Sequence, residues 1–110
     1  MRISRVATIP VDRYLFLQIH TDEGIVGLGE VGTWGFLEAA EQVVNKFAHY
    51  LVGQDPLRIE HHWQYLYRST HFRGAAIMGA LSAIDIALWD ICGKHFGVPV
   101  YALLGGKNAR

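Results

Sequence analysis

Two carboxylates interrupt the most apolar stretch of the sequence, LSAIDIALWDICGK, at Asp85 and Asp90. A carboxylate in apolar surroundings costs free energy unless donors or cations pair with it, so these residues are either catalytic acids or structural groups. Five residues of helix turn by about 140°, which directs the two side chains away from a shared substrate. Asp90 precedes Lys94 by four residues, the favourable order for a helical ion pair. We therefore expect structural roles for Asp85, Asp90 and Lys94, with Asp85 accepting hydrogen bonds from the backbone of a neighbouring loop.

Histidine and cysteine form no recognisable site in the sequence. No two of the six histidines are three or four residues apart on one expected helix, which argues against a metal centre built from this chain alone. The single cysteine, Cys92, lies in the apolar stretch, where an inert buried thiol is expected. The segment GLGE (27–30) lacks the lysine and serine of a phosphate-binding loop. The residues alone therefore indicate no nucleophile with its base.

The composition and the charge of the chain argue against several classes of partner. The 110 residues contain 10 Lys+Arg and 10 Asp+Glu, a formal net charge of zero, which argues against nucleic acid or an anionic membrane as a partner. The N-terminus lacks the charged and apolar regions of a signal peptide. The longest apolar run, Ala75 to Trp89, is broken by Asp85 and is too short to span a bilayer. We expect a cytoplasmic protein that forms a homo-oligomer, since zero net charge gives little repulsion between copies.

The first third of the chain has the alternating pattern of β-strands. In the middle strand, apolar residues alternate with Gln18 and His20, so we expect the side that carries these two residues to face water. Gly27 and Gly29 lack side chains on one face of the third strand, which indicates that another backbone packs closely there. The expected antiparallel meander consists of Ile3–Pro10, Tyr14–Thr21 and Ile25–Glu30.

After Gly35 the apolar residues recur with the 3.6-residue period of helices. Gly53 is expected to end the first helix. Asp55 followed by Pro56 predicts an N-cap and a first-turn proline for the second helix. The third helix is apolar nearly all round, which predicts that it is buried. Strands followed by three to four helices define an α+β domain. The expected helices are Phe36–Leu51, Asp55–Tyr67, Gly74–His95 and a short segment at Pro99–Leu104.

Three motifs occur in the order seen in one protein family: TDEGIVGLGE (21–30), VGQDPLRIEHHWQYLYR (52–68) and ALSAIDIALWDICGKHFGVPVYALLGG (80–106). Over residues 1–110 the chain resembles the N-terminal capping domain of the enolase superfamily, in its mandelate racemase and muconate lactonizing branch. The segments RYLFLQIHTDEG and HFRGAAIMGALSAID are most similar to galactonate dehydratase-like acid-sugar dehydratases. The resemblance implies the same enolase N-terminal domain-like fold.

The resemblance also implies how the work is divided between domains. In the family a C-terminal (β/α) barrel, absent from this chain, holds Mg²⁺ and carries the acid and base that remove the proton α to a carboxylate. The parent protein is then expected to be a dehydratase, a carbon–oxygen lyase, and this chain alone is expected to be inactive. Two alternatives remain open. One is a racemase, epimerase or lactonizing enzyme of the same superfamily, and the other is a non-catalytic binding or assembly module.

Substrate selection is the role that the resemblance gives to the loops of this domain. The loop between the first two strands is short, at about Val11–Arg13. The segment VGTWGF is expected to place Trp34 over the sugar acid, and the alternative is a packing residue at the domain seam. The segment STHFRG offers His71 and Arg73 to the hydroxyls or carboxylate of the substrate.

Overall fold

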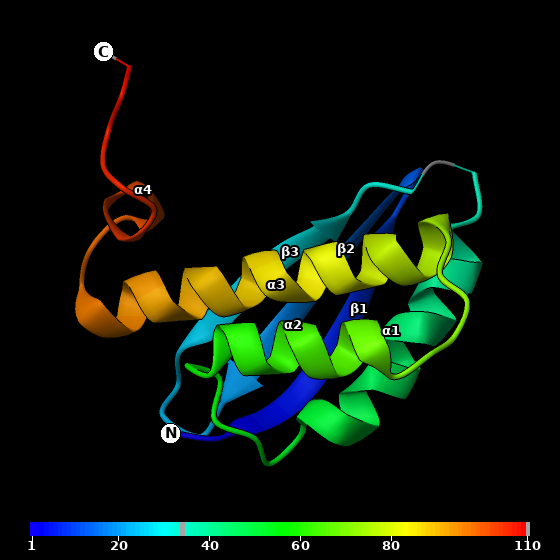
Figure 1. Cartoon of the computed structure of the whole chain (residues 1–110), viewed down its shortest axis with the longest axis horizontal. Coiled ribbons are helices and arrows are strands. Elements are labelled where there is room, and N and C mark those ends of the chain that lie inside the picture. The colour runs from blue at the N-terminus through cyan, green and yellow to red at the C-terminus, as the bar shows by residue number, and fades with distance from the viewer. Residues whose placement is uncertain (34, 110) are drawn as a thin grey trace.

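The computed structural model describes residues 1–33 and 35–109 of the chain. A three-stranded antiparallel sheet of order β1-β2-β3 comes first, and helices cover one of its faces (Figure 1). This arrangement confirms the predicted α+β meander followed by helices. The elements are β1 (Ile3–Val11), β2 (Tyr14–Thr21), β3 (Val26–Val31), α1 (Leu37–Leu51), α2 (Ile59–Arg68), α3 (Ala75–Phe96) and α4 (Val100–Leu103).

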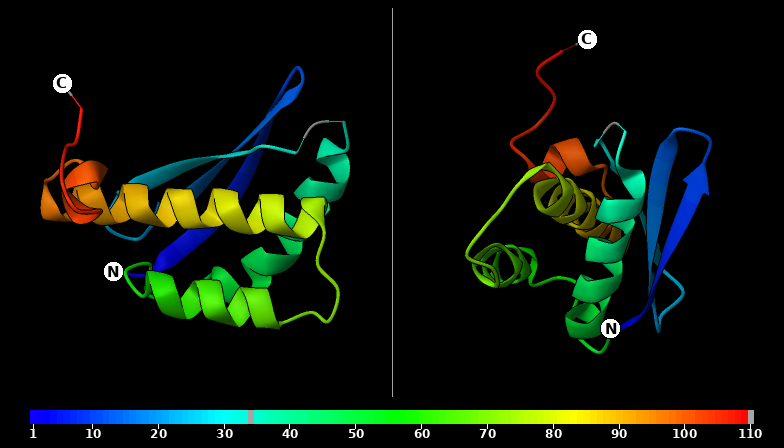
Figure 2. Two further views of the ribbon diagram at one scale, coloured as in Figure 1. Left: turned by 45° about the horizontal axis from the view of Figure 1, so that its top comes forward. Right: turned by 90° about the vertical axis from the view of Figure 1, so that its right-hand side faces the viewer.

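The two faces of the sheet differ as the alternation in β2 predicts. Leu15, Leu17 and Ile19 are buried beneath the helices, whereas Gln18 and His20 lie half-buried on the open face. In Figure 2 the right-hand view shows the helices on one side of the sheet only. The hydrophobic effect therefore fixes the register, since a one-residue slip would move Leu15, Leu17 and Ile19 to the open face.

Helix α3 lies directly against β3 because two glycines make room for it. A Cβ atom at Gly27 would collide with the carbonyl oxygen of Ala87, and one at Gly29 with the carbonyl oxygen of Ala83. The close approach of another backbone, expected from the two glycines, is confirmed. The long apolar helix and the edge strand thus form the centre of the domain.

Helix α1 packs by the predicted apolar stripe, with one exception at its start. Phe36 was expected to begin the buried face, but it precedes the helix and is 74% exposed. Gly53 follows the C-terminal cap with a φ of 89°, as a helix-ending glycine does. The stripe buries Ala40, Val44, Phe47 and Leu51.

The predicted start of α2 is wrong, because Asp55 forms a turn and not a helix cap. Its Oδ1 accepts the backbone N–H of Leu57 at 2.9 Å, and its carbonyl oxygen accepts the N–H of Arg58 at 3.3 Å. Aspartate and proline favour such a turn as strongly as a helix start. The helix begins at Ile59, and Pro56 is buried in the turn before it.

Helix α3 is less enclosed than its composition predicts. One flank is buried against β3 and α1, but Ile86 is 50% exposed, and Asp85, Trp89 and Asp90 are half-buried on the outer flank. At 22 residues, with a mean hydropathy of 1.7, the helix is also long and apolar enough to cross a membrane, contrary to the expectation from the shorter run. In the fold it is the central packing helix of the domain.

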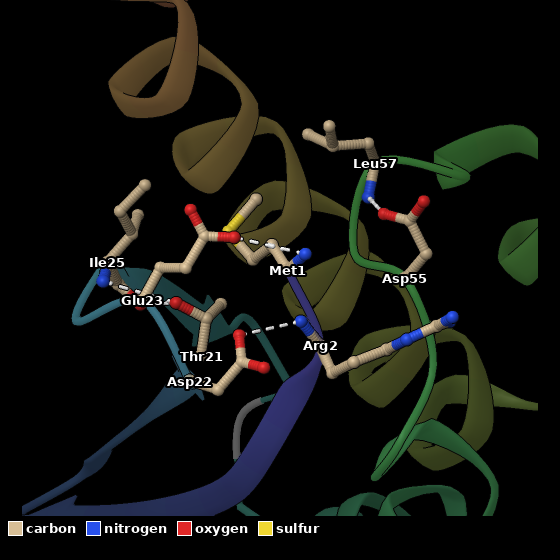
Figure 3. A network of polar contacts seen from close by, with 8 residues as sticks. All are labelled: Met1, Arg2, Thr21, Asp22, Glu23, Ile25, Asp55 and Leu57. Atoms are coloured by element: carbon tan, nitrogen blue, oxygen red, sulfur yellow. Dashed lines mark hydrogen bonds and ion pairs between the residues drawn. The ribbon is translucent and has the colours of Figure 1, made fainter.

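The start of the chain is fixed at the end of the sheet where β2 turns into β3 (Figure 3). The Met1 amino group lies 3.0 Å from Oε2 of Glu23, and the Arg2 N–H donates to Oδ1 of Asp22 at 2.8 Å. A hydrogen bond to Glu23 and its charge raise the pKa of the terminal amine. These contacts position β1 beside β2.

Candidate functional site

Three connections lie at the opposite end of the domain. They are the β1–β2 turn, the β3–α1 connection and the α2–α3 connection, all at the right-hand end in Figure 1. The right-hand view of Figure 2 shows the β1–β2 turn and the α2–α3 connection on opposite sides of this end, with the β3–α1 connection between them. The Thr33 hydroxyl joins two of them by donating to the carbonyl oxygen of Ala75 at 3.1 Å. A hollow of about 230 Å³ lies between the β1–β2 turn and the β3–α1 connection. It is lined by Asp12, Arg13, Gly35, Leu37 and Glu38.

The β1–β2 turn is as short as predicted, and its conformation is unusual. Asp12 has a φ of 55°, a left-handed conformation that aspartate tolerates better than most residues. The Arg13 guanidinium donates to the Tyr14 hydroxyl, with N–O distances of 3.1 and 3.3 Å. The β1–β2 turn, whose Arg13 side chain is fixed by Tyr14, therefore forms one polar wall of the hollow.

The α2–α3 connection holds Arg73 in a defined orientation. Its Nε donates to the carbonyl oxygen of Tyr67 at 2.8 Å, and its Cζ lies 3.8 Å from the centre of the Tyr67 ring. Tyr67 in turn stacks on Trp63, with the ring centres 4.7 Å apart. Within the described residues nothing else bonds the two terminal nitrogens of Arg73, so they remain available to an anion. His71, two residues earlier, is exposed.

Two exposed phenylalanines at this end were not identified from the sequence. Phe72 is 85% exposed and Phe36 is 74% exposed. The Thr70 hydroxyl donates to the carbonyl oxygen of Phe72 at 2.8 Å, which shapes the backbone that presents this ring. The sequence did contain a signal for Phe72, because it is the one large apolar residue in the otherwise polar segment STHFRG. Trp34, expected over the sugar acid, lies outside the described residues.

Asp90 and Lys94 form the predicted ion pair, with Nζ and Oδ2 3.0 Å apart. The pair also covers the free edge of β3, because Oδ2 of Asp90 accepts the Leu28 N–H at 2.9 Å and Nζ of Lys94 donates to the Val26 carbonyl oxygen at 2.7 Å. An uncovered edge strand would leave these backbone groups unpaired.

Asp85 has a different environment from Asp90. The backbone hydrogen bond expected for Asp85 is accepted by Asp90 instead, so that expectation is wrong. Burial and the charge of Glu60 raise the pKa of Asp85, while a hydrogen bond from Trp89 opposes them. Both aspartates also line one hollow beside α3, although the helical angle between them suggested divergent directions.

The part of the chain that the structure describes contains no group of three His, Cys, Asp or Glu side chains able to hold a metal ion. The described residues therefore do not fit the Mg²⁺ site that the resemblance implies for the parent enzyme. What this domain offers is a set of polar and aromatic side chains on three connections at one end of the fold.

Sequence comparison agrees with this architecture over nearly its whole length. Residues 2–105 match the N-terminal domain of the mandelate racemase / muconate lactonizing enzyme family. The chain belongs to this family. A crystal structure of an enolase from Pantoea ananatis with bound D-gluconate and Mg superposes with a TM-score of 0.93 at 40% identity, covering 98% of this chain and 28% of that one. A member of the enolase superfamily from Salmonella Typhimurium gives 0.92 at 36% identity, covering 98% and 30%.

Curated relatives of this mandelate racemase / muconate lactonizing N-terminal domain include D-galactonate dehydratases. That of Pectobacterium atrosepticum is 51% identical over 108 residues, and that of Xanthomonas euvesicatoria is 52% identical over 108 residues. Each alignment covers 96% of this chain. The chain spans only 28% of the length of these relatives, so most of each relative lies outside the matched domain.

Proposed function

We propose that this chain is the substrate-selecting capping domain of a Mg-dependent, galactonate-type acid-sugar dehydratase. The observation that carries the proposal is the identity of about half the residues with D-galactonate dehydratases over 96% of the chain. A second line of support is the crystal structure with D-gluconate and Mg, whose matching domain has the same fold. The protein is proposed to be cytoplasmic and a homo-oligomer.

The chemical step is assigned to the rest of the longer protein. The reaction is removal of the proton α to a carboxylate, followed by loss of water, and it needs a base and a metal that the described residues do not offer. The contribution of this domain is differential binding of the substrate. Arg73 suits that role because its stacked guanidinium can pair with a carboxylate at little further cost in side-chain entropy. His71 is proposed to contact the sugar hydroxyls, and Trp34 is proposed to lie over the sugar acid with its aromatic face.

The proposal is tested by kinetics of the full-length protein on a panel of aldonic acids with Mg²⁺. We expect dehydration of galactonate or a close epimer, and no turnover by the 110-residue chain alone. Arg73→Gln should raise KM or change the order of substrates while leaving Mg²⁺ affinity unchanged. Arg68→Gln, an exposed arginine on α2, is the matched control. Racemised or lactonised products would contradict the dehydratase assignment. An unchanged KM and an unchanged order of substrates in Arg73→Gln would contradict the role of Arg73.

A further inference from the structure

A recess of about 520 Å³ lies between α2 and α3, away from the three connections described above. Its lining combines two carboxylates, Glu60 and Asp85, with two half-buried tryptophans, Trp63 and Trp89. Acidic groups beside large aromatic faces are the features that proteins use to bind organic cations. The substrate-selecting role proposed for this domain does not involve this recess.

The negative charge of the recess is not balanced. Within residues 1–33 and 35–109, Glu60 accepts a hydrogen bond only from the neutral amide of Gln64, at 3.0 Å, and Asp85 is bonded by Trp89. Among the residues that the structure describes, no lysine, arginine or histidine forms an ion pair with either carboxylate. Asp90, five residues further on, is by contrast paired with Lys94. Two neighbouring carboxylates that repel each other favour a cation between them.

The tryptophans indicate which kind of cation fits. Trp63 stacks on Tyr67 with an interplanar angle of 12°, so its ring is held in place from one side. A guanidinium is planar, weakly hydrated and able to stack on an indole while donating to carboxylates, whereas an ammonium is a strongly hydrated point charge. The chemistry of the recess therefore favours arginine over lysine.

An apolar hollow of about 640 Å³ continues the recess on the other side of Trp89. Asp85 and Trp89 line both spaces, and Ile86 and Leu104 leave 50% and 63% of their surfaces exposed in this one. An arginine flanked by apolar side chains would fill both spaces together. The relatives of this chain carry most of their length outside the matched domain, which gives such a segment a source.

We propose that the recess between α2 and α3 binds an arginine side chain from the polypeptide that lies outside this domain in the longer relatives. Glu60 and Asp85 pair with the guanidinium, and Trp63 and Trp89 contact it. The apolar hollow beside Trp89 receives the apolar neighbours of that arginine. The inference rests on the proposed function only in taking this chain to be one domain of a longer protein.

The first experiment tests recognition of the cation by the 110-residue chain. N-acetyl-L-arginine amide is titrated against the chain while the indole N–H signals are followed by NMR, with the isosteric, uncharged N-acetyl-L-citrulline amide as the matched ligand. We expect saturable shifts of the Trp63 and Trp89 indoles with arginine only. The E60Q/D85N double variant should bind about tenfold more weakly. The E30Q/E41Q variant removes the same charge at other exposed or half-exposed positions and should bind as wild type does.

Equal shifts with citrulline, or equal affinity in E60Q/D85N, would overturn the proposal. Spermidine is titrated as a third ligand. If this free polyamine binds more tightly than the arginine amide, the recess is a site for a small-molecule cation and the proposal of a polypeptide arginine is wrong. In the full-length protein, E60Q/D85N should speed hydrogen exchange in α2 and α3 relative to E30Q/E41Q, and equal exchange would also contradict the inference. None of these measurements depends on turnover. A failure of the dehydratase assignment, seen in the kinetics, can therefore be distinguished from a failure of this inference.

Discussion

His62 is a fully buried polar residue whose two ring nitrogens are both used. Its Nε2 lies 2.7 Å from the carbonyl oxygen of Asp55, which can only accept, so Nε2 carries the proton. Its Nδ1 must then accept from the Tyr50 hydroxyl, 2.8 Å away. The neutral imidazole thereby joins α1, the turn at Asp55 and α2.

This geometry predicts a loss of stability in mild acid. Burial lowers the pKa of His62 from its usual value of 6.5, and the charges of His61 and Arg58 act in the same direction, whereas Asp55 opposes them. The unfolded chain therefore binds the proton before the folded chain does. The contribution of His62 to the free energy of unfolding is complete above pH 6.5 and decreases as the pH falls below it.

Urea unfolding between pH 7 and roughly pH 5 measures this effect. We expect the free energy of unfolding of the wild type to fall more steeply with decreasing pH than that of His62→Gln, which cannot titrate. His20, whose pKa is also lowered by burial and by Arg5, contributes to both proteins and cancels in the comparison. His49→Gln, at an exposed position on α1, should retain the wild-type slope. Identical slopes in wild type and His62→Gln would contradict the assignment.

At the scale of elements, the contact between β3 and α3 depends on Gly27. Gly27→Ala would place a methyl group against the carbonyl oxygen of Ala87, which belongs to a helix backbone and cannot rotate away. Overpacking of this kind costs about 3 kcal/mol in the free energy of unfolding. Gly32→Ala is the control, since a Cβ there meets nothing within 4 Å. Denaturant unfolding of both variants decides the matter, and equal stabilities would show that the helix can shift.

The edge of β3 gives a second prediction at this scale. Asp90→Ala removes the acceptor of the Leu28 N–H, which then lies at an uncovered strand edge. Loss of a hydrogen bond worth about 1 kcal/mol should speed exchange of the Leu28 amide about fivefold. Asp85→Ala, on the same helix, should leave this amide unchanged because Asp85 makes no bond to β3. Amide exchange followed by NMR measures both, and an unchanged Leu28 rate in Asp90→Ala would show that the edge is covered by other means.

The sequence predicts these elements well where one periodicity dominates. Alternation in β2 and the 3.6-residue stripe of α1 each reflect burial of one face, and Gly27 signals its close contact because no other residue would fit. The start of α2 could not be predicted, since Asp55 and Pro56 suit a turn and a helix cap alike. The burial of His62 was also hidden, because its partners Tyr50 and Asp55 belong to other parts of the chain.

The candidate site was predictable only in outline for the same reason. The segments that contain His71 and Arg73 could be assigned to a connection, but the stacking of Arg73 on Tyr67 needs the folded end of α2. The recess with Glu60 and Asp85 joins residues from two helices, and neither helix alone carries its signal. Local patterns therefore predict the elements, whereas the sites arise from contacts between them.

At the scale of the whole molecule, apolar surface gathers on the outer side of α3 and α4. Ile86, Phe96, Tyr101 and Leu104 each leave at least half of their surface exposed. Ile86 and Leu104 line one hollow, so part of this apolar surface is contiguous. A large contiguous apolar surface is uncommon on monomers and marks a surface that another polypeptide covers. The formal net charge of zero provides little repulsion to keep copies of the chain apart.

The 110-residue chain on its own should therefore self-associate as its concentration rises. Sedimentation velocity over a wide range of concentrations measures this directly. Ile86→Lys combined with Leu104→Lys places two charges on the apolar surface and should shift the protein toward monomer. Ser4→Lys combined with Asn45→Lys adds the same charge at exposed positions on β1 and α1, so it separates a local effect from a change in net charge. If the wild type stays monomeric at every concentration, or both double variants dissociate equally, the outer surface of α3 and α4 does not mediate the association.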